Sequence, residues 1–161
     1  MINIKTNHGD ITIEIFENEA PITSENFLQY IKDGSYSGTI FHRVIPNFMI
    51  QGGGMDKNMV PISTRDPIKN EANNGLKNKR GTLAMARTNV IDSATSQFFI
   101  NLNDNDFLDY GDRDYGYAVF GKVADGMEIV DLIARVSTGN KHGHQDVPLE
   151  TVEIIEVKIN D

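Results

Sequence analysis

The chain has 161 residues, of which 39% are hydrophobic and 24% charged, a composition typical of a globular protein that excludes a disordered or fibrous one. Its formal net charge of −8 argues against nucleic-acid binding, because phosphate backbones are bound by clustered lysine and arginine. At this length we expect a single domain, spanning residues 1–161, around one core.

Cysteine is absent from the sequence, so neither disulfides nor thiolate chemistry is available. The N-terminal residues alternate like a strand and lack the apolar core of a signal peptide. No segment approaches the roughly 18 apolar residues of a membrane span. We therefore expect a cytoplasmic protein that does not bind membranes.

The first elements expected are a β-hairpin and a helix. Isoleucines alternate with polar residues on both sides of Asn7-His8-Gly9, which predicts two strands joined by a glycine-bearing turn. A helix is predicted from about Pro21 to Lys32, because proline is favoured in a first turn and Gly34 can end it. Its apolar face is expected to contain Phe27, Leu28 and Ile31.

The segment from Phe41 to Gly53 is patterned like two short strands and places a single arginine, Arg43, among apolar residues. A guanidinium stays charged in a protein and presents five rigidly placed N–H donors. The segment therefore predicts an apolar pocket with one polar clamp, suited to polarising a carbonyl or an amide.

The rest of the chain predicts a long excursion, further strands and a second helix. About 28 residues rich in Asn, Lys, Asp and Pro lead from Gly53 to Gly81, and a loop of this length is expected to lie against the site. Strands are predicted at 97–101 and 118–123, and a helix at 126–135 with Asp125 as its cap. The apolar stripe of this helix is expected to be core.

The last predicted strand, 152–159, places Ile155, Val157 and Ile159 on one face and is expected to close against the first strand. Many short strands with two helices predict a mainly β fold, a closed barrel capped at its ends.

Five segments in order resemble the cyclophilin family of peptidyl-prolyl cis-trans isomerases. They are residues 41–53, LAMAR at 83–87, SQFFI at 96–100, FLD at 107–109 and VFGKVADGM at 119–127. NEANNG at 70–75 and AMART at 84–88 look like the bacterial cytosolic branch. The resemblance implies a closed eight-stranded antiparallel β-barrel capped by two α-helices. It also implies cofactor-free isomerisation of Xaa-Pro bonds, which assists folding, with proline-containing peptides and unfolded or partly folded proteins as partners.

The resemblance also implies the site residues. Arg43 would be the catalytic arginine and Gln51 its polar companion. The proline pocket would consist of Phe48, Met49, Phe99 and Leu108. Ala86 and the Arg87 backbone would line the groove in which the residues before proline lie extended.

Two positions depart from the best-known eukaryotic pattern, since Phe107 replaces a tryptophan and Tyr117 a histidine. Losing the indole N–H should weaken cyclosporin A binding more than turnover. Because tyrosine replaces histidine at position 117, the resemblance does not settle how that wall of the pocket is formed.

Other readings of single residues are weaker. His42 neighbours Arg43 but is interpreted as structural, because bond rotation transfers no proton and strand neighbours face opposite sides. His142 and His144 lack a third ligand, so no metal is expected. The rival to an isomerase is a proline-peptide recognition module, and a hydrolase would lack an assembled nucleophile and base. We expect a monomer.

Overall fold

The computed structural model describes residues 1–111 and 113–160. Within them the chain forms eleven strands, two α-helices and two 3₁₀ helices. In chain order these are β1 (Ile2–Thr6), β2 (Gly9–Ile15), α1 (Pro21–Lys32), β3 (Thr39–Ile40), β4 (Arg43–Ile45), β5 (Met49–Gly52), η1 (Ala72–Asn74), β6 (Thr82–Met85), β7 (Phe98–Asn101), η2 (Asp106–Leu108), β8 (Val119–Asp125), α2 (Met127–Ala134), β9 (Thr138–Lys141), β10 (His144–Pro148) and β11 (Glu153–Ile159). Neither described helix, at 12 and 8 residues, has the length and apolar character needed to cross a membrane.

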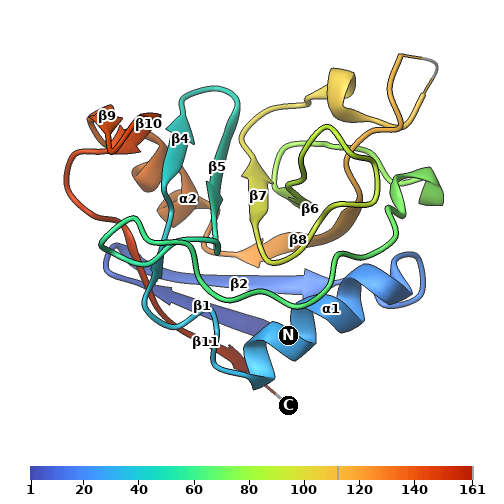
Figure 1. Ribbon diagram of the computed structural model, residues 1–161, viewed down its shortest axis with the longest axis horizontal. Helices are drawn as coiled ribbons and strands as arrows, with labels where there is room; N and C mark the ends of the chain where they lie inside the picture. Colours follow the sequence, from blue (N-terminus) through green and yellow to red (C-terminus); the bar gives the residue numbers. More distant parts are fainter. Residues whose placement is uncertain (112, 161) are drawn as a thin grey trace.

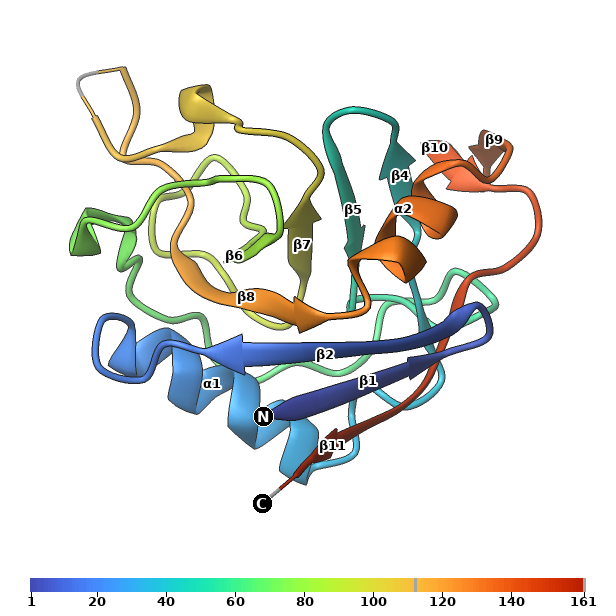
Figure 2. The same cartoon turned by 180° about the vertical axis from the view of Figure 1, so that it is seen from behind.

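Nine of the described strands form one curled antiparallel sheet in the order β3-β11-β1-β2-β8-β6-β7-β5-β4 (Figures 1 and 2). This confirms the mainly β fold with two helices, but the strand count and the closure differ from the expected closed barrel of eight. The edge strands β3 and β4 follow one another in the chain, separated by Phe41 and His42, but they lie at opposite ends of the strand order and do not pair. The remaining described strands, β9 and β10, form a separate hairpin that contacts β4.

The predicted pairing of the first and last strands is confirmed, but the face predicted for the last strand is wrong. β1 pairs with β2 through the two-residue turn and with β11 on its other side. The register jumps from Lys5↔Glu156 to Thr6↔Ile154, so Ile155 is an unpaired bulge residue. Ile154 and Val157 therefore face the core, whereas Ile155 and Ile159 are each 42% exposed.

The first helix has the predicted bounds. Its N1 residue is Pro21, and Gly34 follows its end with a positive φ of 72°. The core side is centred on Phe27 and Tyr30, which are buried, while Leu28 and Ile31 pack at its margin.

The second helix begins after Gly126, and the predicted cap at Asp125 is wrong. Gly126 is the N-cap, with a φ of 94°, and no side chain caps the helix. A Cβ at this position would lie 2.5 Å from the Asp10 carbonyl oxygen, so only glycine fits the close approach to β2. The apolar stripe is core as predicted, since Val130 and Ile133 are fully buried.

The excursion between Gly53 and Gly81 packs on the body of the protein rather than standing away from it. The buried Glu71 carboxylate accepts hydrogen bonds from the Ile22 and Thr23 backbone N–H groups at 3.2 and 2.7 Å, which satisfies the free donors at the start of α1. Further along, Leu76 packs against the second apolar cluster described below.

Strand alternation divides the apolar side chains of β4 to β7 between two faces. The inner face, which includes Val44, Ile50 and Phe98, belongs to the main core beneath α1 and α2. The outer face carries a second, smaller cluster built on Met49 and Phe99. The outer face is therefore the place where a pocket can form without opening the core.

Candidate functional site

Four neighbouring strands place one row of side chains across the outer face of the sheet. The register pairs Arg43 with Gln51, Gln51 with Phe99, and Phe99 with Ala84. Residues directly opposite in an antiparallel sheet lie on the same face, so the guanidinium, the amide and the ring follow one another. The small Ala84 leaves room above the ring.

A pocket of about 120 Å³ opens over this row. It is lined by Arg43, Phe48, Met49, Gln51, Ala86, Arg87, Phe99, Leu108 and Tyr117. The structure therefore brings together nine of the ten site residues expected from the sequence. Because drug-sized ligands occupy pockets of roughly 300–1,000 Å³, this volume suits a single ring or side chain.

Phe107 is the tenth expected residue, and it lies outside the pocket. Its side chain is 61% exposed and its ring stacks on Phe48, with centroids 5.6 Å apart. The opposite wall is more enclosed, since the Tyr117 ring packs edge-on against Phe99 at 5.8 Å. Phe107 is thus placed at the rim, where it can meet a ligand longer than one residue.

The Arg43 guanidinium is oriented by two glutamines. Arg43 Nη1 donates to Gln51 Oε1 at a long 3.4 Å, and Gln51 Nε2 donates to Gln97 Oε1 at 2.8 Å. Gln97 was not predicted from the sequence. A Cβ at Gly54 would collide with the Gln97 side chain, so the glycine leaves space for that amide to reach Gln51. The one sequence feature that pointed to this contact was Gly54, a glycine shortly after the strand that carries Gln51.

The chemistry of this arrangement is narrow. Among the described residues that line the pocket there is no carboxylate and no imidazole, and the one hydroxyl is the Tyr117 phenol. What remains is a permanent cation with directed N–H donors beside an apolar slot. Such a site can hold an apolar ring and polarise an adjacent amide, but it has no group for acyl transfer.

Comparison with known proteins identifies the family and the fold. A model of the family described as cyclophilin type peptidyl-prolyl cis-trans isomerase/CLD matches residues 1–159. The chain belongs to the cyclophilin family of peptidyl-prolyl cis-trans isomerases.

Bacterial relatives match this cyclophilin along its length. A peptidyl-prolyl cis-trans isomerase of Acinetobacter baylyi is 60% identical over 159 residues, covering 99% of this chain and 85% of that protein. Peptidyl-prolyl cis-trans isomerase B of Escherichia coli is 56% identical over 164 residues, covering 100% of both chains. These matches confirm the resemblance to bacterial members.

A solved cyclophilin from Cryptosporidium parvum, crystallised in the presence of the dipeptide Ala-Pro, has a similar fold. The TM-score is 0.82 at 29% identity, and the match covers 99% of this chain and 98% of that one. The curled sheet with two helices is therefore the fold of this family.

In this cyclophilin the Arg87 side chain supports the pocket wall from behind. It is only 4% exposed and donates to the Gly116 carbonyl at 3.1 Å, to the Thr88 carbonyl at 2.9 Å and to Asp114 Oδ2 at 2.9 Å. Its Cζ also lies 4.6 Å from the centroid of the Tyr117 ring. The sequence indicated only the Arg87 backbone, so this second role was missed.

A chain of buried asparagines holds the two other walls. Asn105 Nδ2 donates to the Phe48 carbonyl at 2.9 Å and to Asn101 Oδ1 at 2.8 Å. Asn101 donates to Asn78 Oδ1 at 3.1 Å, and Asn78 donates to the Leu108 carbonyl at 3.2 Å. The three amides thus connect the backbones of the facing residues Phe48 and Leu108.

His42 directly precedes β4 and, unlike the exposed Arg43, is buried. Its side chain is 6% exposed. Burial, reinforced by His144 and Arg43, lowers the His42 pKa to about 4. It belongs to the interior and does not line the pocket. In the part of the chain that the structure describes, no group of three His, Cys, Asp or Glu residues could hold a metal ion.

Proposed function

We propose that this cyclophilin isomerises Xaa-Pro bonds at the pocket beside Arg43, by binding the twisted amide more tightly than either planar isomer. Amide resonance imposes a barrier of about 18–20 kcal/mol on this rotation. A catalyst needs no covalent step, since any interaction that strengthens in the twisted state lowers the barrier. The single observation that carries the proposal is the guanidinium beside a ring-sized apolar pocket.

In this mechanism Phe99, Met49, Phe48 and Leu108 hold the pyrrolidine ring of proline. Met49 and Phe99 are 2% and 4% exposed, so they form the rigid base of the pocket. With the ring held, the carbonyl that precedes proline is the part that rotates. The aromatic and thioether surfaces also exclude water from the reacting amide.

Arg43 supplies the interaction that strengthens during rotation. When resonance is lost the prolyl nitrogen becomes pyramidal and basic, so a donor aimed at it, or at a neighbouring carbonyl, is favoured in the twisted state. One preorganised donor of this kind contributes about 2.7–4 kcal/mol. Gln51 holds the guanidinium and can also donate to the substrate backbone.

The substrates on this proposal are extended segments of unfolded or partly folded proteins, and the activity assists their folding. Ala86 and the Arg87 backbone continue the pocket into a neighbouring groove that also contains Thr95 and Gln97. An extended peptide laid along this groove would add its backbone to the site. The Cryptosporidium parvum relative, crystallised in the presence of Ala-Pro, supports a ligand of this class.

Cyclosporin A is proposed as a second ligand with weakened affinity. The exposed Phe107 ring offers apolar contact at the rim but no N–H donor. We further propose that residues 1–161 act as one monomeric domain in the cytoplasm, without nucleic-acid or membrane partners. The net charge of −8 and the lack of cysteine support these assignments.

The experiment is a protease-coupled isomerisation assay on a short Ala-Pro peptide. Wild-type protein should accelerate the cis-to-trans step, and Phe99→Ala should lower kcat/KM by at least roughly tenfold, since it removes about 1.5–3 kcal/mol of ring contact. Tyr110→Ala is the matched control, because that ring is half exposed and does not line the pocket. Peptide binding without wild-type acceleration would indicate a recognition module instead.

A further inference from the structure

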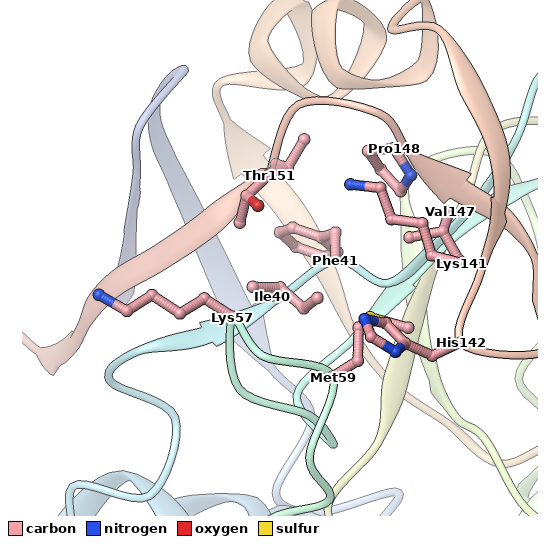
Figure 3. A pocket seen from close by; sticks show the side chains of 10 residues that line it. Ile40, Phe41, Lys57, Met59, Lys141, His142, Val147, Pro148 and Thr151 are labelled. Carbon is pink, nitrogen blue, oxygen red and sulfur yellow. The ribbon is translucent and has the colours of Figure 1, made fainter.

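A second cavity lies away from the proline pocket, between the bend that joins β3 to β4, the β9–β10 hairpin and the loop at residues 57–59 (Figure 3). Its volume is about 350 Å³, at the lower end of the range for small-molecule sites. The two cavities share no lining residue among those described. A ligand bound here would therefore leave the proline pocket free.

The cavity has an apolar floor. Ile40, Phe41, Val147 and Val152 are 4%, 0%, 2% and 0% exposed, so the floor belongs to the packed body of the protein. Little of this floor is accessible, so an apolar ligand would cover its surface beside the half-buried Met59. Removing the remaining apolar surface from water favours binding.

The rim, in contrast, carries the nitrogen donors of Lys141 and His142, whereas the Lys57 ammonium points away from the other labelled side chains (Figure 3). Lys57, Lys141 and His142 line the cavity, and no Asp or Glu is among its described lining residues. This is unusual in a chain with 23 acidic and 15 basic residues. Lys141 Nζ donates to the Leu149 carbonyl at 2.8 Å, and its side chain extends over the cavity in Figure 3.

Two lining residues also hold strained backbone conformations. Met59 and His142 have φ values of 63° and 48°, in the left-handed region that non-glycine residues rarely adopt. His142 and Gly143 are the two central residues of the β9–β10 turn, a hairpin geometry with positive φ at both positions, so the turn holds His142 at the cavity.

We propose that this cavity binds a small amphipathic anion, a carboxylate joined to an aromatic or branched apolar body. The apolar body would lie over the floor beside Met59, and the carboxylate would face Lys141. The ammonium would exchange a neutral carbonyl partner for a charged one, and such charge-assisted hydrogen bonds are about twice as strong.

The test is a titration of ¹⁵N-labelled protein with 3-phenylpropionate, followed by amide chemical shifts. The proposal predicts saturable shifts at Phe41, Val147 and Val152, with none at Phe99 or Tyr117. The neutral 3-phenylpropanamide should bind roughly tenfold more weakly, because it lacks the charge. Shifts confined to the proline pocket, equal affinities for the acid and the amide, or no saturation would each overturn the proposal.

Lysine variants distinguish specific binding in this cavity from general attraction of the anion to surface charge. Lys141→Gln should weaken 3-phenylpropionate binding by roughly tenfold, and Lys57→Gln by less, because the Lys57 ammonium points away from the other labelled side chains in Figure 3. Lys158→Gln is the control, since its ion pair with Glu156 lies on β11. An equal loss in Lys158→Gln would overturn the assignment to this cavity.

Discussion

At the scale of single residues, the orientation of the Arg43 guanidinium depends on two glutamine side chains. Among the described residues, the Arg43 side chain donates one hydrogen bond, at 3.4 Å to Gln51, and Gln51 donates to Gln97 at 2.8 Å. Because the first contact is long, the orientation of the donor depends on Gln51 staying fixed. Gln97 is therefore a positioning residue for the proposed reaction.

Gln97→Ala should lower kcat about fivefold and change KM by less than about twofold. The lost hydrogen bond is worth about 1 kcal/mol, and the affected interaction forms mainly in the twisted state. Steady-state kinetics on the Ala-Pro peptide measure both constants. Gln29→Ala is the matched control, because that amide bonds Glu25 on the exposed side of α1. A change in KM alone would show that Gln97 contacts substrate instead of positioning Gln51.

Phe107→Trp should tighten cyclosporin A binding about fivefold and leave kcat/KM within about twofold. The new indole N–H adds one hydrogen bond worth about 1 kcal/mol, whereas the peptide needs only apolar contact at this exposed rim. Isothermal titration with cyclosporin A beside the isomerase assay measures both effects. Equal gains in drug affinity and turnover would contradict the placement of Phe107 outside the pocket.

At the scale of elements, strand alternation accounts for most of the site. Phe98 and Phe99 are adjacent on β7, and the structure sends the first into the core and the second into the pocket. The asparagine chain adds a constraint between elements, since it ties the turn before β5 to the 3₁₀ helix η2.

Asn105→Ala should destabilise the protein by about 1–3 kcal/mol and raise KM for the peptide. The substitution leaves the side-chain oxygen of Asn101, Oδ1, without its donor and frees the Phe48 backbone, so that the pocket walls are no longer fixed. Urea unfolding and isomerase kinetics measure the two effects. Asn103→Ala, on the exposed side of the same loop, is the control. An unchanged KM with lowered stability would show that the network supports the fold alone.

The sequence allowed the elements and the pocket residues to be predicted, but not the contacts that depend on register. The hairpin follows from the alternation of apolar and polar residues, and α1 from the proline and glycine at its ends. The pocket residues follow from the segments that resemble cyclophilins. The bulge at Ile155 and the start of α2 at Gly126 depend on how β1 and β2 approach them, which no local pattern encodes. Gln97, Asn105 and the Arg87 side chain were missed for the same reason.

At the scale of the whole molecule, the buried His42 couples stability to pH. The folded protein holds it with a pKa of about 4, below the usual value of 6.5, so the unfolded chain binds its proton more readily. Stability is therefore complete above about pH 6.5 and falls as the pH drops toward 4.

When the pH is lowered from about 7 to 5, His42 should reduce the unfolding free energy of the wild type by about 2 kcal/mol. His42→Gln should remove this part of the pH dependence of stability. Urea unfolding at the two pH values measures it. His8→Gln is the control, because that side chain lies in the turn between β1 and β2. An equal loss in His42→Gln would show that other groups cause the pH dependence.

The most direct measurement compares wild type with Arg43→Ala for both binding and exchange of an Ala-Pro peptide, by NMR. If Arg43 acts on the twisted amide, the exchange rate of bound peptide should fall about 10²–10³-fold while Kd changes less than about threefold. Arg135→Ala, at the far end of α2, is the control for loss of a charge. Exchange that survives in Arg43→Ala, or a loss explained entirely by weaker binding, would contradict the assignment of Arg43 as the catalytic donor.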